Sequence, residues 1–340
     1  MPTRRFAFVI VGFEAEFWLL RLQAQSMARY LPVALVHEIV VIDNSVDGMP
    51  PDVTRGLLDD YGDLTGLVRI LRPQEICPVP GAIGWRSQQV LKLCVAELLT
   101  CDRYVVLDAK NLFVATLEPG FLEASDGRAR VIVYGYETHP MRPALEHVLT
   151  YLGLDPSRYV PGFTATVTPF VLDTATVKAL IRDIERSSGR SFAQEFVARG
   201  LTEFFLYSGW IASKGRSLEE VFDFHKVSCP TVWPHAANLE GVREAIRLAR
   251  ERGTPVFSVQ RNALARLDAA SVAELASFWV ERDLFPSAAE AVLAIADFQH
   301  AYVRQARTQR IRELPYRLRT RSRRAARKVL RFISRRARSA

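Results

Sequence analysis

One segment joins an acid, a lysine and an amide in a way that could hold a phosphate group. In Tyr104-Val-Val-Leu-Asp108-Ala-Lys110-Asn111, Asp108 directly follows an apolar run. An acid at the end of a buried strand can bind a divalent cation, and the cation can neutralise a diphosphate leaving group. Two hypotheses follow for Lys110: its ammonium neutralises the phosphates itself, or Asp108 binds Mg²⁺ or Mn²⁺ with partners elsewhere. The structural alternative is an ordinary acid at a strand end beside a solvent-facing lysine.

A second segment combines a predicted helix start with polar side chains. Gly84 and Trp85 open the pattern, and Gln88, Gln89 and Lys92 follow at helical spacing. A helix start aimed at a sheet edge can receive phosphate, and Lys92 adds positive charge. We therefore predict that these residues bind a phosphate-bearing ligand. The alternative is an amphipathic helix whose polar face is simply hydrated.

A third segment places an acid next to a run of aromatic residues, Thr202-Glu203-Phe-Phe-Leu-Tyr207. Thr202 can cap a helix, and Glu203 then lies in its first turn, where the helix dipole favours a carboxylate. Because the aromatic run is too apolar for a surface, Glu203 is expected at a pocket wall. It is a candidate general base or ligand of an acceptor hydroxyl, and the alternative is a plain helix-start acid.

Histidines supply weaker candidates. His225 and His235 follow late in a loop rich in proline and aromatic residues. Imidazole binds metals and phosphate, so His225 is a candidate metal ligand with Asp108. A lone histidine is more often structural.

The elements that must position these residues alternate along the first half of the chain. Apolar runs predict strands at 6–11, 38–42, 68–71, 104–107, 130–134 and 166–172, and helical patterns lie at 17–30, 85–99, 143–152 and 173–186. This alternation predicts an α/β fold with a mostly parallel central sheet and flanking helices. Ligands of such sheets bind beyond the carboxyl ends of the strands, so Asp43, which follows the second strand, is a candidate contact for the base or ribose of a nucleotide.

Further patterns predict a helical C-terminal part. Helices are expected at 192–199, 203–213, 239–252, 269–279 and 287–304. We predict an α/β domain over residues 1–240, a helical extension over 241–303 packed on it, and a basic tail over 304–340. Four cysteines without regular spacing are expected to be reduced thiols.

Taken in order, these segments resemble an uncharacterised bacterial family of glycosyltransferase-like proteins. The resemblance covers about residues 5–235 and runs through Phe13–Leu20, Gly84–Leu93, Leu107–Phe113, Thr168–Leu172 and Thr202–Tyr207. It implies the glycosyltransferase-A fold, a nucleotide-sugar donor and Mg²⁺ or Mn²⁺. Many enzymes of that fold carry Asp-x-Asp where this chain has Asp108-Ala-Lys110, which leaves both hypotheses for Lys110 open. The implied function is glycosyl transfer, and we expect the acceptor to be a cell-surface glycan or a lipid-linked saccharide.

The charge of the chain is concentrated at one end. Residues 304–340 hold 15 Arg or Lys and one acid, while the chain as a whole carries a formal charge of +8. Within 314–338, Leu318, Val329 and Phe332 recur near helical spacing among the arginines, which favours an anionic membrane surface over nucleic acid, since an apolar stripe gains nothing against phosphates. Without a signal-like start or an apolar stretch long enough to span a bilayer, a cytoplasmic protein on the inner face of the membrane is expected.

Two other functions remain open. A binding module of the same fold without catalysis, targeted by its tail, is consistent with Lys110 in place of an acid. Nucleotidyl transfer is less consistent, because that chemistry usually uses a glycine-rich basic loop after the first strand, and Val11-Gly12-Phe13-Glu14 is not one.

Overall fold

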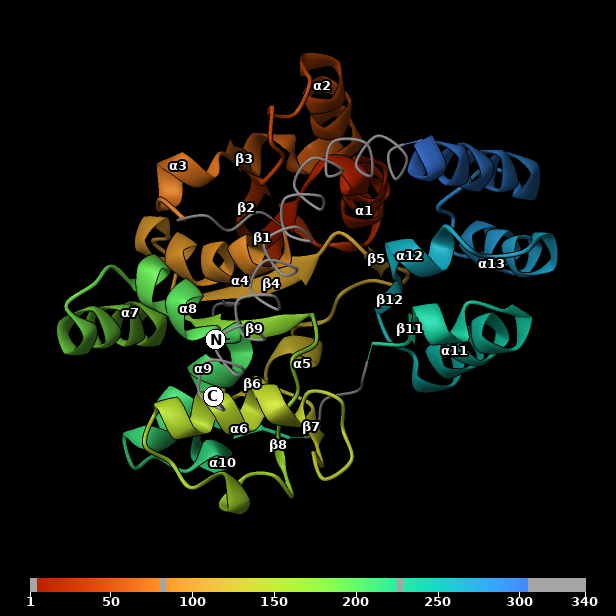
Figure 1. Ribbon diagram of the computed structural model, residues 1–340. Helices are drawn as coiled ribbons and strands as arrows, with labels where there is room; N and C mark the ends of the chain where they lie inside the picture. The colour runs from red at the N-terminus through yellow and green to blue at the C-terminus, as the bar shows by residue number, and fades with distance from the viewer. Residues whose placement is uncertain (1–4, 80–83, 225–228, 305–340) are drawn as a thin grey trace, which may run out of the picture.

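The computed structural model describes residues 5–79, 84–224 and 229–304, and a five-stranded sheet lies at its centre (Figure 1). The strand order is β3-β2-β1-β4-β9, with bounds Val68–Leu71, Val36–Asp43, Phe6–Gly12, Arg103–Asp108 and Phe170–Asp173. Four strands are parallel, and β9 pairs antiparallel with β4. The predicted α/β fold with a mostly parallel sheet is confirmed.

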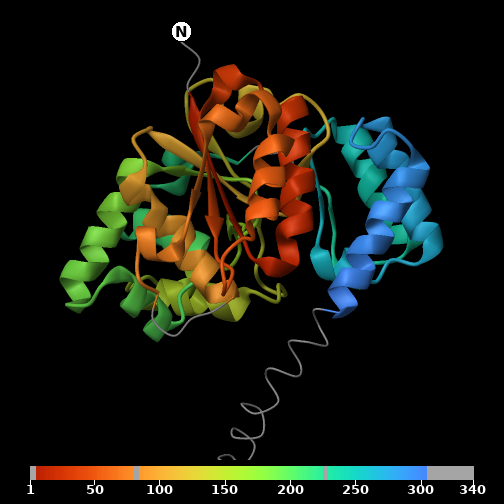
Figure 2. The ribbon, with the colours of Figure 1, turned by 90° about the horizontal axis from the view of Figure 1, so that it is seen from above.

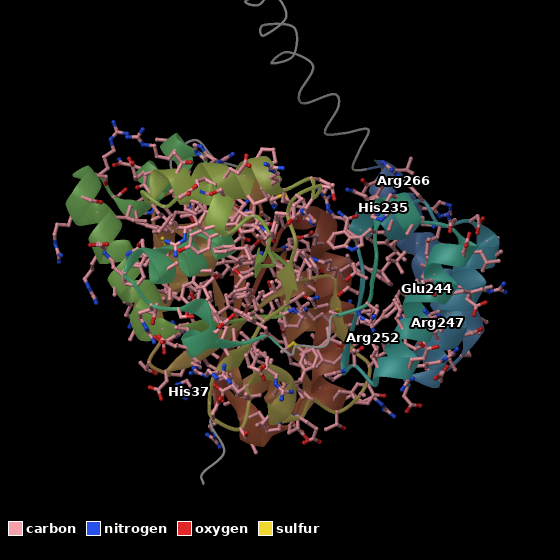
Figure 3. All side chains as sticks on the ribbon, turned by 90° about the horizontal axis from the view of Figure 1, so that it is seen from below. His37, His235, Glu244, Arg247, Arg252 and Arg266 are labelled. Carbon is pink, nitrogen blue, oxygen red and sulfur yellow. The ribbon has the colours of Figure 1, made fainter. Side chains whose placement is uncertain are left out.

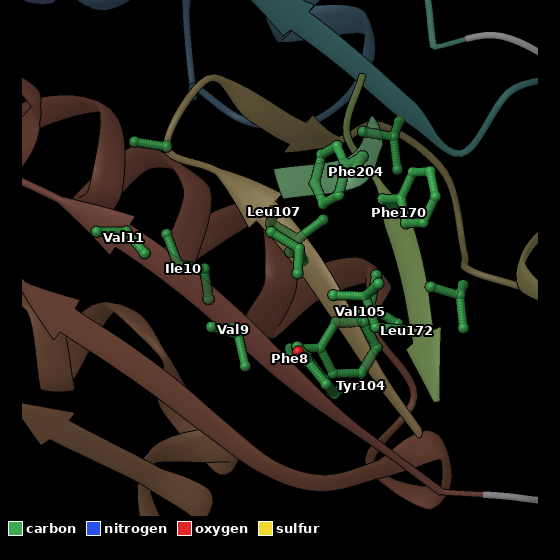
Figure 4. Packing of buried hydrophobic residues seen from close by; sticks show 14 of the residues in the cluster. Phe8, Val9, Ile10, Val11, Tyr104, Val105, Leu107, Phe170, Leu172 and Phe204 are labelled. Carbon is green, nitrogen blue, oxygen red and sulfur yellow. The ribbon is translucent and has the colours of Figure 1, made fainter. Parts of the chain in front are cut away.

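The middle strands are buried on both faces, which explains their continuous apolar sequence. All seven residues of β1 are buried, as expected for a parallel strand covered by helices on each side. Figure 4 shows Val11, Leu107 and Phe204 among the core side chains around β1, β4 and β9. Val11 on β1 pairs with Asp108 on β4. This register places the last residues of the two strands side by side at the carboxyl edge of the sheet, where Asp108 follows the apolar core.

Helices cover the two faces of the sheet (Figure 2). One face carries α1 and α2, and the other carries α4 with α7, α8 and α9 around it; their bounds are Phe17–Tyr30, Pro51–Asp60, Trp85–Cys94, Thr174–Ser188, Phe192–Arg199 and Glu203–Ser213. Strand β4 follows β3 in the chain but lies on the far side of β1, so this crossover runs in the opposite direction to the crossover from β1 to β2. Because both crossovers are right-handed, α4 lies on the opposite face of the sheet from α1. The start of α4 therefore lies above the carboxyl ends of β1 and β4.

Short elements complete the first part. The pairs are β6 with β10 and β7 with β8, at Ala129–Arg130, Phe222–Asp223, Val133–Tyr134 and Phe163–Thr164; the helices are α3, α5, α6 and α10, at Pro73–Ile76, Pro119–Leu122, Arg142–Tyr151 and Leu218–Val221. Three predicted elements differ from the structure. The strand expected at 130–134 is broken into β6 and β7, and the strand expected at 166–172 is shortened to Phe170–Asp173. The helix expected at 85–99 ends at Cys94 and continues as a 3-10 turn over Val95–Leu98.

The C-terminal part is helical but also supplies a strand. Its helices are α11, α12 and α13, at Leu239–Arg252, Arg261–Leu264 and Ala269–Glu281, followed by a helix over 288–304. Strand β12 (Val256–Val259) lies between β11 (Thr231–Val232) and β5 (Asn111–Phe113), parallel to the first and antiparallel to the second. Strand β12 was not predicted from the sequence, because Val256–Val259 is short and its apolar residues are interrupted by Ser258. The boundary at residue 240 stays a prediction.

Within the described ranges, no helix is both long enough and apolar enough to span a bilayer. None of the four cysteines, all of which the structure describes, takes part in a disulfide. The basic tail over 305–340, including the predicted amphipathic segment 314–338, lies outside the described residues.

Candidate active site

A cavity of about 500 Å³ opens where β1 and β4 end. Its wall is formed by the strand ends, the start of α4, the loop before β9, the start of α9 and two loops of the C-terminal part; the polar side chains among its lining residues are Glu16, Gln88, Lys92, Asp108, Lys110, Thr166, Thr168, Thr202, Glu203, Gln260 and Arg261. A volume of this size is typical of small-molecule sites. The place agrees with the rule for open α/β sheets, in which ligands bind at the carboxyl ends of the strands.

Asp108 is held between two lysines in this cavity. Its Oδ1 accepts a hydrogen bond from Lys92 Nζ at 2.8 Å, and its Oδ2 accepts from Lys110 Nζ and, at 3.0 Å, from Thr168 Oγ1. Burial alone would raise the pKa of Asp108, but the two ammonium groups outweigh burial and hold it well below its usual range. Asp108 is therefore a carboxylate at any ordinary pH.

Asn111 and Gln23 fix the backbone that presents Asp108. Asn111 Oδ1 accepts from the Asp108 amide at 2.7 Å, and Asn111 Nδ2 donates to Ser258 Oγ at 2.8 Å. Gln23 Nε2, from α1, donates to the carbonyls of Asp108 and Asn111. Asn111 is buried and does not line the cavity. The predicted contact of Asn111 with a ligand is corrected to a positioning role, and Gln23 was missed because no local signal distinguishes it.

Lys92 also faces Glu203 across the cavity. Its Nζ lies 3.5 Å from Glu203 Oε1 and 5.6 Å from the centre of the Phe204 ring. The Lys92 and Glu203 side chains are each 7% exposed. Burial would lower the pKa of Lys92, but Asp108 and Glu203 reverse this and raise it. Burial raises the pKa of Glu203, with Lys92 acting against that change. Thr202 occupies the N-cap position of α9 without a side-chain cap bond, so its hydroxyl is available to the cavity it lines.

Two tryptophans form open parts of the wall. Trp85 is 60% exposed and Trp233 is 37% exposed, which is unusual for such large apolar side chains. Lys110 Nζ lies 5.6 Å from the centre of the Trp233 ring. Flat aromatic faces of this kind stack on planar or sugar-ring ligands. Trp85, Gln88, Lys92 and Lys110, which were predicted to bind a phosphate-bearing ligand, all line this cavity.

Glu16 and Arg261 form a second charged pair at the cavity, which the sequence analysis did not name. Arg261 Nε lies 3.6 Å from Glu16 Oε1, and its guanidinium lies 4.7 Å from the centre of the Phe13 ring. Burial raises the pKa of Glu16 to about 7, against the lowering effect of Arg261. The acidic, aromatic segment after the first strand was the only sequence signal for Glu16, and Arg261 had none.

Glu16 should make the stability of the protein depend on pH. The folded protein keeps the Glu16 proton up to about pH 7, whereas the unfolded chain loses it near 4.5. Between these values the unfolded state binds fewer protons, so the free energy of unfolding should fall by about 3 kcal/mol as the pH rises and then stay level. In Glu16→Gln this fall should be absent. Urea unfolding at pH 5 and pH 8 measures this change in the free energy of unfolding. Glu240→Gln, which removes an exposed carboxylate on α11, is the control. Equal pH dependence in the wild type and in Glu16→Gln would contradict the prediction.

Two further predicted residues, Asp43 and Gln89, do not line the cavity. Asp43 is buried, and its carboxylate accepts from Arg72 at 2.6 Å and from the Ser45 hydroxyl. Because these groups occupy it and Asp43 does not line the cavity, the predicted contact with a base or ribose is not supported there. Gln89 points into the protein, where its amide is buried without a partner among the described residues. His225, the predicted metal ligand, lies outside the described residues.

The carboxylates of the cavity do not fit a divalent cation. Both oxygens of Asp108 accept from ammonium groups, and Glu203 faces Lys92. A cation at Asp108 would lie against two positive charges, which repel it. In the described part of the chain, no three His, Cys, Asp or Glu side chains form a set that could hold a metal ion. Of the two hypotheses for Lys110, this geometry favours the one in which its ammonium takes the place of a metal.

Comparisons with known proteins give a family and a set of similar folds. Residues 20–238 match the model of a protein family described as a family of unknown function, DUF6492. No curated protein matches the sequence. Among solved structures, an active-site mutant of LgtC aligns at 11% identity over 55% of this chain and 65% of that chain, with a TM-score of 0.36.

Two further solved structures are similar. Glucosyl-3-phosphoglycerate synthase from Mycobacterium tuberculosis, in complex with Mn²⁺, UDP and glucosyl-3-phosphoglycerate, aligns at 14% identity over 63% of this chain and 81% of that chain, with a TM-score of 0.32. The glycosyltransferase GlyE from Streptococcus pneumoniae TIGR4 aligns at 10% identity over 88% and 64%, with a TM-score of 0.42. This chain thus spans less than two thirds of the LgtC and GlyE chains. At these identities and TM-scores, no residue role carries over from these structures to this chain.

Proposed function

The chain belongs to DUF6492, a family of unknown function, and from its cavity we propose that it is a glycosyltransferase that uses a nucleotide-sugar donor. The observation that carries this proposal is the meeting of Lys92, Asp108, Lys110 and Glu203 in one cavity at the carboxyl edge of the sheet. These residues come from α4, from the end of β4 and the turn after it, and from α9. Together they offer two cations for a diphosphate and a carboxylate for an acceptor hydroxyl.

The lysines suit a diphosphate leaving group. An ammonium has three N–H donors, and within the described residues Lys110 donates to Asp108 alone. Its remaining donors are free to bind a phosphate oxygen. Asp108 keeps both lysines in place before a ligand arrives, so little reorganisation is needed when negative charge develops on the departing diphosphate. Trp85 and Trp233 offer faces for the base or the sugar ring.

The reaction step needs no metal in this arrangement. The bond between the anomeric carbon and the diphosphate oxygen breaks, and its electron pair leaves with the diphosphate toward Lys92 and Lys110. The acceptor oxygen forms the new bond to the anomeric carbon, and its proton passes to the Glu203 carboxylate. Burial raises the basicity of that carboxylate, which suits a general base.

The acceptor and location belong to the same proposal. We propose a cell-surface glycan or a lipid-linked saccharide as acceptor, and a cytoplasmic protein bound to the inner face of the membrane. The support is the sequence of residues 314–338 alone, with arginines around an apolar stripe. The full chain should bind phosphatidylglycerol vesicles and not phosphatidylcholine vesicles in a flotation assay, and the binding should weaken with added salt. Equal binding to both would contradict an electrostatic anchor.

A non-catalytic binding module remains the alternative, because the same charges would hold a nucleotide sugar without turning it over. The test is release of nucleoside diphosphate from a panel of UDP-, GDP- and ADP-sugars, measured with candidate acceptors and with EDTA or Mn²⁺. Release that EDTA does not reduce supports the proposed function. Binding of a nucleotide sugar without release, for every acceptor, would favour the binding module. Neither binding nor release would reject both.

A further inference from the structure

The C-terminal part of the chain completes the wall of the cavity. Ser258 on β12 pairs with Asn111, and the Val259 amide donates to the Lys110 carbonyl at 3.4 Å. The Gln260 amide then donates to the Val232 carbonyl at 3.1 Å. These hydrogen bonds hold the end of β12 beside the turn that contains Lys110. Gln260 and Arg261 follow β12 directly, and both line the cavity. The two residues lie beyond the 20–238 region that the family model matches.

Arg261 is the most loosely paired of the three cations that line this cavity. Lys92 is 2.8 Å from Asp108, and Lys110 is also hydrogen-bonded to it. Within the described residues, Arg261 meets one carboxylate, Glu16, at 3.6 Å, beyond a good hydrogen bond. Its side chain is 28% exposed, and the Phe13 ring supports one face of the guanidinium. The planar guanidinium of Arg261 thus has N–H donors available to the cavity, while the Phe13 ring and Glu16 hold the side chain in place.

We propose that Arg261 is a ligand-binding residue of this site, which takes a phosphate oxyanion of the donor diphosphate and exchanges its weak pairing with Glu16 for that contact. The inference rests on the proposed function and names a residue that serves it. Arginine matches phosphate oxygens bidentately, which an ammonium does not.

The diphosphate is the favoured source of the oxyanion because of where Arg261 lies. Backbone hydrogen bonds from β12 place it beside the Lys110 turn, and Lys110 stands over Trp233 on the same wall. One anionic group can therefore reach both Lys110 and Arg261. A phosphate on the acceptor offers the same chemistry, and binding experiments separate the two sources.

The experiment measures binding by calorimetry with the full chain. The probes are UDP, GDP and ADP, the matching monophosphates, and glucose 1-phosphate as a phosphorylated saccharide. Arg261→Gln should bind its preferred nucleoside diphosphate about 10- to 100-fold more weakly, as expected for loss of hydrogen bonds to a charged group. Arg261→Lys should lie between this variant and the wild type, because it keeps the charge without the fork. Glu16→Gln should bind a few-fold more tightly, since its carboxylate no longer competes for Arg261.

Arg266→Gln is the matched control. Arg266 is exposed on the surface of the C-terminal part (Figure 3) and does not line the cavity, so this variant loses the same charge and should bind as the wild type does. Diphosphate binding that is unchanged in both Arg261 variants would overturn the inference and leave the proposed function standing. A loss confined to glucose 1-phosphate would overturn it in favour of the acceptor. If the unmutated protein binds no nucleoside diphosphate, the proposed function itself fails.

Discussion

Replacing Lys92 by methionine should lower sugar transfer by about 100-fold or more and lower the free energy of unfolding by about 3 kcal/mol. Methionine keeps an unbranched side chain as far as Cε and removes the ammonium group. Asp108 would then keep Lys110 alone, and Glu203 would lose the one ion pair that the described residues give it. Leaving buried carboxylates without their cation is costly, and the diphosphate would lose one of its partners. Turnover assays and urea unfolding measure the two effects.

Lys178→Met separates these effects from the loss of a lysine in general. Lys178 on α7 is partly buried and donates to the Leu99 carbonyl at 3.1 Å, away from the cavity. It should keep full activity. Stability losses of equal size in the two variants, with turnover retained in both, would show that Lys92 only supports the fold and that the site is misassigned.

Replacing Glu203 by glutamine should reduce the turnover number by about 10²- to 10⁴-fold, as for loss of a general base. Glutamine keeps the shape of the side chain, so the fold and the KM for the donor should change little. Burial raises the pKa of Glu203, and a base acts only when ionised. Wild-type turnover should therefore fall as the pH drops through that raised pKa, and the residual activity of the glutamine variant should lack this fall.

Glu195→Gln provides the comparison for a buried glutamate with a purely structural role. Glu195 on α8 is 3% exposed and pairs with Arg199 at 2.9 Å and Arg190 at 3.6 Å, outside the cavity. This variant should lose stability and keep both turnover and its pH profile. If Glu203→Gln retains full turnover, another group takes the acceptor proton, and Glu16, the other glutamate of the cavity, becomes the candidate.

Lys92 and Lys110 explain why the structure favours neutralisation of the diphosphate by lysine over the hypothesis that Asp108 binds a metal ion. The sequence alone shows that Lys110 replaces an acid, and it leaves open whether Asp108 finds other metal partners. The structure adds Lys92, 16 residues earlier in the chain, on the second oxygen of Asp108. With that contact, both oxygens of Asp108 are paired with lysine ammonium groups and neither is left for a metal ion.

The layers of the fold, and four residues that line the cavity, were predicted from local patterns in the sequence. Apolar runs predict the four parallel strands of the central sheet, and the helical period predicts α1 and α7; both patterns are local, so they can be read within a window of about 10–18 residues. Asp108 and Lys110 stand at or just after the end of β4, Glu203 begins α9, and Lys92 lies in the last turn of α4; all four line the cavity.

Which other polar residues line that cavity depends on contacts between segments that are distant in the sequence. Asp43 ends a strand at the same edge but is held by Arg72, and Asn111 follows Asp108 closely but supports its backbone instead. Glu16 and Arg261 meet across 245 positions of the chain. Such contacts depend on the register of β12 against β5 and on side-chain directions. No local period records these, because they are set by the packing of segments far apart in the sequence.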